Sequence, residues 1–235
     1  MKKAFIAVSM AVFFGFCTAV AMCVQALNGA QAVSAFDDGG MRIVVDAGHG
    51  GVDGGVVGRT TGVKESDLNL AIAHTLKEEL ESIGFEVTLT RKTEAGLYGA
   101  ATKGFKKRDM QRRKEIIEET APILVLSIHQ NYYPSRAVRG GQVFYEETNA
   151  RSAQLAECVQ KQLNSIYAEQ GAKERKTAKG DYFMLDCTEY PSIIVECGFL
   201  SNAADEALLC TDAWKKKLSE AIAVGVMGYL ADGSV

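Results

Sequence analysis

Apolar residues along the chain follow two alternating patterns. Short runs at 41–46, 85–90, 122–128, 142–146 and 192–196 predict β-strands. Longer segments at 66–83, 152–168 and 213–230 carry apolar residues every three or four positions and predict helices, and the polar segment 107–119 predicts another. Three strand runs, RIVV, ILVL and SIIV, are continuously apolar, which is typical of strands covered on both faces. We therefore expect an α/β fold in three layers, with a mostly parallel twisted sheet flanked by helices on both faces.

The first predicted helix, 66–83, has marked ends and a clear apolar stripe. Ser66 is a candidate N-cap and Gly84 a candidate stop signal. His74 lies two positions from both Ile72 and Leu76, so we expect it on the exposed face of the helix. The stripe consists of Leu68, Ile72, Leu76, Leu80 and Ile83.

The N-terminus resembles an export signal. Lys2 and Lys3 precede an uncharged run from Ala4 to Val24, and a small-residue stretch with an A-x-A site follows. Because about 20 apolar residues can span a bilayer, an uncleaved membrane anchor is the alternative to a cleaved signal peptide. We expect residues 1–35 to direct export. Residues 36–235 then form a domain that acts at the outer face of the cytoplasmic membrane, or in the extracytoplasmic or forespore intermembrane space.

The net charge, the basic clusters and the cysteines restrict which partners and which kinds of metal site the chain is expected to have. A net charge of −3 does not indicate a nucleic-acid partner. Basic clusters at 103–114, 173–179 and 215–217 are interpreted as solvated surfaces, with anionic wall polymers or membrane as the alternative. The chain has no C-x-x-C pair, which disfavours a cysteine zinc site. Outside the cytoplasm, one or two disulfides could form among Cys158, Cys187, Cys197 and Cys210. Buried free thiols are the favoured interpretation.

The segment VDAGHGGVDGG, residues 45–55, contains five glycines around His49. Each ordered glycine costs about 0.5–1 kcal/mol relative to alanine, so the segment predicts a close approach of the backbone to another group, or a tight turn. Phosphate binding is disfavoured. The pattern G-x-x-x-x-G-K-[ST] is absent, and Asp53 stands where G-x-G-x-x-G needs its third glycine.

Polar residues follow three of the predicted strands at equivalent places. His49 follows the first strand, His129 follows ILVLSI and Glu196 ends SIIVE. Sites in open α/β sheets form at the carboxyl ends of strands, so these residues are expected to meet. A catalytic zinc takes three protein ligands, such as two histidines and a carboxylate, and Glu65 at the start of a helix is suitably placed. A structural, hydrogen-bonded histidine is the alternative.

Five sequence pieces together carry a family resemblance. IVVDAGHGGVDGGVVG, KESDLNLAIA, VTLTR, LSIHQN and IIVECGFLSN, in this order over about residues 41–230, resemble the zinc-dependent N-acetylmuramoyl-L-alanine amidases of bacterial cell walls (amidase type 3). The resemblance implies an α/β sheet flanked by helices, as in zinc carboxypeptidases. It implies one Zn²⁺ per chain, with His49, Glu65 and His129 as its ligands and Glu196 as the catalytic glutamate. The chain departs from the family at Ala47, usually proline, and at Gln130, commonly alanine.

Metal chemistry and local sequence suggest roles for Glu196 and for neighbouring residues. Glu196 is expected to take the proton of a zinc-activated water and pass it to the leaving amine, with a buried salt bridge as the alternative. Asp46 and Asp53 are candidates for orienting the imidazole, or for capping turns. Asn131 is a candidate for binding substrate, or for a turn. Cys197 is interpreted as packing rather than as a nucleophile.

The implied reaction is cleavage of the amide bond between N-acetylmuramic acid and L-alanine in peptidoglycan. A zinc peptidase of other specificity and a catalytically inactive wall-binding regulator are the alternatives. Without an appended wall-binding module or a long insertion after Gly140, the chain resembles the sporulation-specific (CwlD) type. That group removes peptides from spore-cortex peptidoglycan so that muramic δ-lactam can form before germination. Targeting would then come from the N-terminal membrane segment or from an activating partner protein.

Overall fold

A computed structural model describes residues 40–100 and 103–233. The predictions for residues 1–35 lie outside this range. The residues from Met41 onward form one compact unit. None of the described helices is both long enough and apolar enough to span a bilayer.

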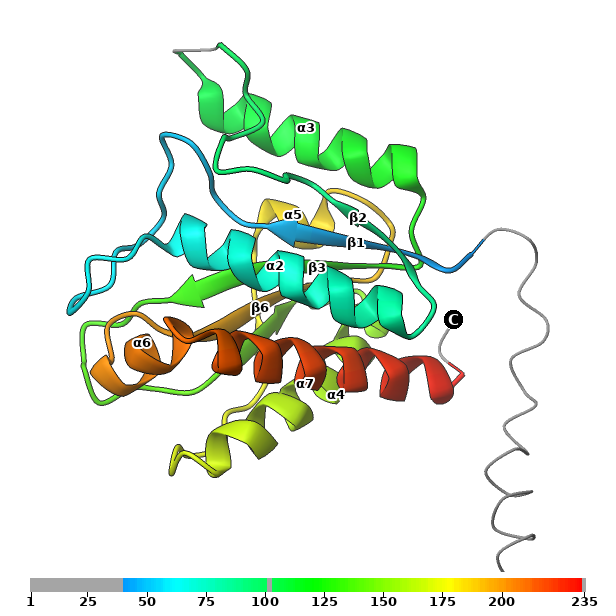
Figure 1. The fold of residues 1–235 in the computed structure, drawn as a ribbon. Coiled ribbons are helices and arrows are strands. Elements are labelled where there is room, and N and C mark those ends of the chain that lie inside the picture. Colours follow the sequence, from blue (N-terminus) through cyan, green and yellow to red (C-terminus); the bar gives the residue numbers. More distant parts are fainter. Residues whose placement is uncertain (1–39, 101–102, 234–235) are drawn as a thin grey trace, which may run out of the picture. The chain divides into compact units, whose positions relative to one another are not determined.

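A six-stranded mixed sheet forms the centre of this unit (Figure 1). The strand order is β2-β1-β3-β6-β4-β5. β2, β1, β3 and β6 run parallel to one another, whereas β4 pairs antiparallel with β6 and β5 runs parallel to β4. The predicted α/β class with a mostly parallel sheet is therefore confirmed. The strands are β1 (Arg42–Ala47), β2 (Glu86–Leu89), β3 (Leu124–Asn131), β4 (Gln142–Tyr145), β5 (Ala178–Lys179) and β6 (Ser192–Phe199).

Helices cover both faces of the sheet, as expected for continuously apolar strands. α2 (Glu65–Ser82), α4 (Ala150–Ala168) and α7 (Asp212–Ala231) contribute to the larger core cluster. α3 (Phe105–Thr120) and the short α5 (Phe183–Asp186) contribute Ile117 and Met184 to a smaller cluster, which also contains Val44 and Val125 from the strands. Side chains alternate along a strand. The face toward α3 and α5 therefore carries the even-numbered residues of β1 and β6. From β3 it carries the odd-numbered residues.

The start of α2 differs from the prediction. The helix begins at Glu65, with Lys64 in the capping position, so the assignment of Ser66 as N-cap is wrong. The first free amides are bonded instead by carbonyls of the glycine-rich loop: Glu65 N donates to Val56 O at 2.9 Å, and Ser66 N donates to Gly54 O at 3.1 Å. Loop and helix are thus joined directly at Glu65.

The rest of α2 follows its apolar pattern, with one exception. Leu68, Ile72, Leu76 and Leu80 are buried, and His74 is exposed as predicted. Gly84 follows the helix with a positive φ of 101°, which suits a glycine stop. Ile83 was expected in the buried stripe, but it is 48% exposed because the helix has already ended at Ser82.

Three short elements were not predicted: β5, α5 and α6 (Ala203–Leu209). They are two, four and seven residues long, too short to show a period. The cysteines of the described region are all free, as favoured, but only Cys197 is buried, whereas Cys158 and Cys187 are half-buried and Cys210 is exposed.

Candidate active site

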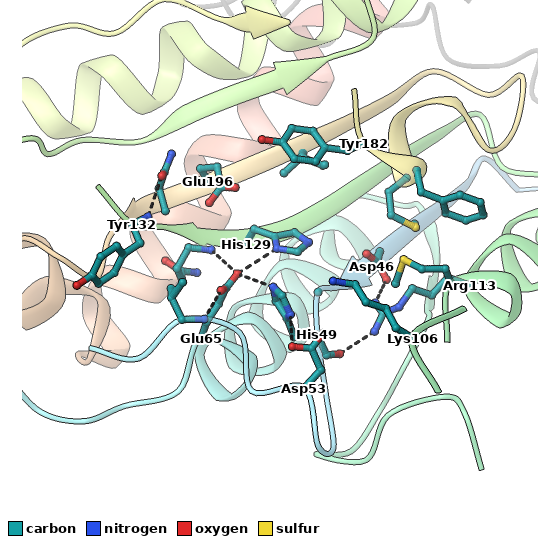
Figure 2. Close-up of a pocket in the computed structure, with 18 residues that line it drawn as sticks. Asp46, His49, Asp53, Glu65, Lys106, Arg113, His129, Tyr132, Tyr182 and Glu196 are labelled. Atoms are coloured by element: carbon teal, nitrogen blue, oxygen red, sulfur yellow. Dashed lines mark hydrogen bonds and ion pairs between the residues drawn. The ribbon is translucent and has the colours of Figure 1, made fainter. Parts of the chain in front are cut away.

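A pocket of about 460 Å³ lies at the carboxyl ends of β1, β3 and β6, on the face of the sheet that α3 and α5 cover. Its lining includes His49, Glu65, His129 and Glu196 (Figure 2). The structure therefore brings together all four residues that the sequence placed at element ends. Asp46, Asp53 and Asn131 line the same pocket.

His49, Glu65 and His129 form a compact group of metal-ligating side chains. His49 Nε2 lies 3.3 Å from Glu65 Oε1, and His129 Nδ1 lies 3.0 Å from the same oxygen. One ligand atom from each residue lies within 4.8 Å of the other two. Each candidate ligand comes from a different element: the loop after β1, the first residue of α2, and β3. The fold, and not a local sequence motif, assembles the group.

The chemistry of this donor set fits a divalent cation. Two imidazole nitrogens and a carboxylate oxygen are the ligands of several catalytic zinc sites. Burial raises the pKa of Glu65, but hydrogen bonds from His129 and His49 outweigh burial and hold it well below its usual range. Burial lowers the pKa of His49, whereas the hydrogen bond and negative charge of Glu65, with those of Asp53, raise it overall. These shifts indicate that a positive charge at the centre of the three side chains is stabilised. A bound Zn²⁺ would supply such a charge.

Asp53 contacts the first imidazole. Its Oδ1 lies 2.9 Å from His49 Nδ1 and also accepts a hydrogen bond from the Gly55 amide. A proton on Nδ1 shared with Asp53 leaves Nε2 as the free nitrogen that faces Glu65. The position of Asp53 therefore matches the orienting role expected for it.

The glycines let the loop approach these side chains closely. A Cβ atom on Gly48 would lie 2.2 Å from His129 Nε2, and one on Gly55 would lie 2.4 Å from Glu65 Oε2. Any larger residue would therefore displace a member of the cluster. His49 itself has a φ of +61°, an uncommon conformation for a residue with a side chain and one often found at functional sites.

Asp46 does not orient an imidazole ring in the expected way. It is fully buried and accepts hydrogen bonds from Ser127 Oγ at 2.5 Å and Thr90 Oγ1 at 2.6 Å, and it pairs with Arg113. Arg113 in turn donates to the carbonyl of His49 at 2.7 Å. Asp46 therefore supports the backbone of His49 through an arginine, because its side chain points to α3.

Two buried arginines were missed by the sequence analysis. Arg113 on α3 donates to the Ala47 and His49 carbonyls, and Arg91 after β2 donates to the carbonyls of Ala47, Gly48 and Ser66. Arg91 has a detectable signal, since it directly follows an apolar strand. Arg113 has none, because it lies among many charged residues of a polar helix.

A buried amide pair supports Glu65 from the opposite side of β3. Asn69 Nδ2 donates to Glu65 Oε1 at 3.3 Å and to Gly48 O at 3.1 Å. Gln130 donates to the same carboxylate oxygen from its backbone, at 3.1 Å, and to Asn69 Oδ1 from its side chain, at 3.2 Å. The glutamine that departs from the family pattern therefore bonds the candidate ligand directly through its backbone, and it also lines the pocket.

Glu196 extends into the pocket from β6. Burial raises the pKa of its carboxyl group to about 7, and its Oε2 is buried without a hydrogen-bond partner among the described residues. Within residues 40–100 and 103–233, no lysine, arginine or histidine nitrogen lies within 4.0 Å of this carboxylate. This environment does not support the salt-bridge alternative. It suits a group that exchanges protons near neutral pH.

Asn131 and the aromatic rim complete the pocket. Asn131 ends β3, and its Oδ1 accepts a hydrogen bond from the Tyr132 amide at 2.8 Å, as a turn residue would. Tyr132, Tyr182 and Phe183 line the opening and are partly exposed. Tyr132 is held by Arg59, whose Nε donates to its hydroxyl at 2.6 Å.

Comparison with known proteins is consistent with this geometry. Residues 43–227 match the family described as N-acetylmuramoyl-L-alanine amidase. The germination-specific N-acetylmuramoyl-L-alanine amidase of Bacillus subtilis (strain 168) is 32% identical over 196 residues, which cover 82% of this chain and 81% of that protein. The structure of the CwlD amidase from Clostridioides difficile in complex with the GerS lipoprotein is similar, with a TM-score of 0.77 and 33% identity over 82% of this chain and 99% of that one. The catalytic domain of CwlV from Bacillus (Paenibacillus) polymyxa var. colistinus gives a TM-score of 0.69 and 28% identity over 81% and 98%.

Proposed function

We propose, from the premise that this chain belongs to the family of N-acetylmuramoyl-L-alanine amidases, that it hydrolyses peptidoglycan with one Zn²⁺ held by His49, Glu65 and His129 and with Glu196 as general base. The amidase activity follows from the family, whose profile spans residues 43–227. The observation that carries the finer proposal is the convergence of two imidazole nitrogens and one carboxylate oxygen within 4.8 Å, in a pocket that Glu196 also lines.

Two of the three ligand side chains have a partner outside the cluster that holds them in place. Asp53 bonds the outer nitrogen of His49, and Asn69 and the Gln130 amide bond Glu65. Such partners fix the orientation of metal ligands and raise metal affinity. A bound Zn²⁺ supplies Lewis acidity, which lowers the pKa of water and polarises the carbonyl group of the amide.

Glu196 handles the protons of the reaction. Its carboxylate accepts a proton from the water whose oxygen attacks the carbonyl carbon of the lactyl group. When the carbon–nitrogen bond breaks, Glu196 gives this proton to the nitrogen of L-alanine, which leaves as an amine. In the metal-free pocket burial raises the pKa of this carboxyl group to about 7, and the positive charge of a bound Zn²⁺ would favour the carboxylate form that accepts the proton.

Product identity and metal content test this proposal together. The full chain, purified without chelators and supplied with zinc, should contain about one zinc per chain. Incubated with peptidoglycan, it should release peptides whose new N-terminus is L-alanine. New N-termini at other positions would indicate a peptidase of different specificity, and absence of zinc would contradict the assigned ligands.

We further propose that the substrate in the cell is spore-cortex peptidoglycan, from which the enzyme removes peptides before muramic δ-lactam forms. The similarity to the germination-specific amidase of Bacillus subtilis and to the CwlD amidase supports this role. Deleting the gene in its host should abolish muramic δ-lactam in the cortex. The wild-type gene should restore it, whereas the Glu196→Gln gene should not. Normal δ-lactam in the deletion strain would argue for a role in vegetative wall turnover.

We also propose that residues 1–35 direct export or anchor the enzyme at the outer face of the membrane, and that a partner protein assists it there. The CwlD structure, determined with the GerS lipoprotein, supports the idea of a partner. Fractionation of the host should find the enzyme in the extracytoplasmic membrane fraction. Co-purification from that fraction, followed by zinc measurement with and without the captured protein, tests assistance by a partner.

A further inference from the structure

We infer that Lys106 is a specificity residue that binds a carboxylate on the peptide part of the substrate. The inference rests on the proposed amidase function and adds a recognition group to the same pocket. Lys106 lines the pocket from the side of α3 (Figure 2).

Lys106 differs from the other cation of the pocket lining. Arg113 is fully buried, and its nitrogens bond Asp46 and Asp109 as well as two backbone carbonyls. Lys106 is exposed, and no carboxylate of the described residues lies within 4.0 Å of its ammonium group. Asp53 interacts electrostatically with Lys106 at longer range, but one oxygen of Asp53 is already bonded to the His49 ring and the Gly55 amide. Lys106 therefore carries a charge that the described part of the chain leaves without a direct partner.

The two halves of α3 differ in whether their basic side chains have acidic partners. In the second half, Arg112 pairs with Glu115 and Glu119 at 3.1 and 2.9 Å, and Lys114 pairs with Glu118 at 3.6 Å. The first turn has no acidic residue, and four exposed cations lie in or just before the start of the helix: Lys103, Lys106, Lys107 and Arg108. Cations are unfavourable at a helix N-terminus because the helix dipole is positive there. An external anion would offset this repulsion, and Lys106 is the member of the four that lines the pocket.

The chemistry of the substrate supplies such an anion. The scissile amide is neutral, but the peptide that begins with L-alanine ends in a carboxylate. The pocket beside Lys106 is lined by Met110, Phe183 and Met184, so an ion pair formed there is less screened than one in open water. A lysine ammonium on a flexible stem can follow carboxylates at slightly different positions, which suits peptides of varied length.

Two muramoyl dipeptides test the inference. One is N-acetylmuramoyl-L-alanyl-D-glutamate with free carboxylates, and the other is the same compound with both carboxylates amidated. Wild-type full-length enzyme should prefer the first by about two- to fivefold in kcat/KM, the range expected for an ion pair with an exposed lysine. Lys106→Gln should lose this preference through a higher KM for the carboxylate substrate, with little change in kcat. Lys106→Arg should keep the preference.

Lys107→Gln is the matched control. Lys107 has the same charge, is also exposed and lies on the same turn, but it does not line the pocket. It should behave like the wild type. Equal effects of Lys106→Gln and Lys107→Gln would overturn the inference, because they would show only a general effect of charge on an anionic polymer.

Two further measurements separate carboxylate binding by Lys106 from a supporting role in the metal site. If Lys106 only supported Asp53, Lys106→Gln would lower zinc affinity and weaken both substrates equally, which would also overturn the inference. Calorimetry can measure the affinities of the two dipeptides for zinc-loaded Glu196→Gln protein, with and without Lys106→Gln. This measurement tests the same preference in the absence of turnover. Preferential binding of the carboxylate form would support Lys106 even if the wild-type enzyme released no L-alanine peptides from peptidoglycan, and that second result would contradict the proposed amidase mechanism alone.

Discussion

Glu196 and His129 are direct neighbours across two strands of the central sheet. They are paired in the parallel register of β6 and β3, and both side chains line the same pocket. Neighbouring strands lie about 4.8 Å apart, so the hydrogen-bonded sheet sets the separation of the proposed base and the proposed metal ligand. A relationship built on backbone pairing is rigid, which suits proton transfer beside a metal.

The first prediction concerns Glu196→Gln. The variant should fold and hold zinc as the wild type does, but lose about 10²–10⁴-fold in kcat, because glutamine cannot accept a proton at neutral pH. Zinc content, melting temperature and release of L-alanine peptides should be measured on one sample. Glu86→Gln, at an exposed position on the edge strand β2, is the control and should remain active. Normal turnover by a folded, zinc-loaded Glu196→Gln protein would refute the assignment.

The second prediction concerns stability against pH in metal-free protein. Because burial raises the pKa of Glu196 to about 7, the folded state holds this proton more tightly than the unfolded state. The unfolded state binds fewer protons between its pKa of about 4.3 and pH 7, so the group costs stability as pH rises through that window. Glu196→Gln should be more stable than the wild type at pH 8, by about 1–3 kcal/mol, and similar to it at pH 4. Urea unfolding at both pH values measures this, and a constant difference would contradict the cause given for the shift.

The third prediction concerns the metal. Alanine at His49, Glu65 or His129 should each remove most bound zinc and abolish the rise in melting temperature that added zinc gives the wild type. His74→Ala is the matched control, since His74 is exposed on α2 and, among the described residues, its ring hydrogen-bonds only the Lys92 carbonyl. Metal analysis and thermal shifts with and without a chelator provide the measurement. Full zinc content in any of the three variants would remove that residue from the ligand set.

The fourth prediction concerns Gly48. A methyl group there would lie 2.2 Å from His129 Nε2, so Gly48→Ala should displace the imidazole and weaken zinc binding about 10–100-fold. Gly228→Ala is the control, because its Cβ would meet no atom within 4 Å and the residue lies in α7. The control should leave zinc affinity unchanged and stabilise the protein by about 0.5–1 kcal/mol. Competition with a fluorescent zinc chelator measures both affinities; unchanged affinity in Gly48→Ala would argue against His129 as a ligand.

The fifth prediction concerns the domain boundary. A chain of residues 36–235 should be soluble, folded and cooperative in unfolding, because the compact unit begins at Met41 and its first strand begins at Arg42. Circular dichroism and thermal melting of the shortened and full-length chains provide the comparison. A shortened chain that aggregates where the full chain folds would show that the N-terminal residues contribute to the fold.

Sequence by itself determined the layers of the fold and the residues worth testing. The apolar stripe of α2 repeats with the helical period, which burial on one face produces, and the continuously apolar strands RIVV, ILVL and SIIV indicate burial on both faces. His49, His129 and Glu196 were recognisable because polar residues interrupt apolar runs at strand ends. Carboxyl ends of parallel strands share one edge, so their proximity followed from the class of fold.

Tertiary structure alone decided which residues support that site. Arg113 is fully buried under the His49 loop, yet in the sequence it is one of many charges in a polar helix. Asp46 acts through this arginine, and the capping carbonyls of Val56 and Gly54 replace the Ser66 cap. The register that pairs His129 with Glu196 depends on strand order, as does the hydrogen bond from the Gln130 amide to Glu65. These contacts join residues far apart in the chain, and no local period records them, because their energy comes from burial and hydrogen bonding that exist only once the sheet has formed.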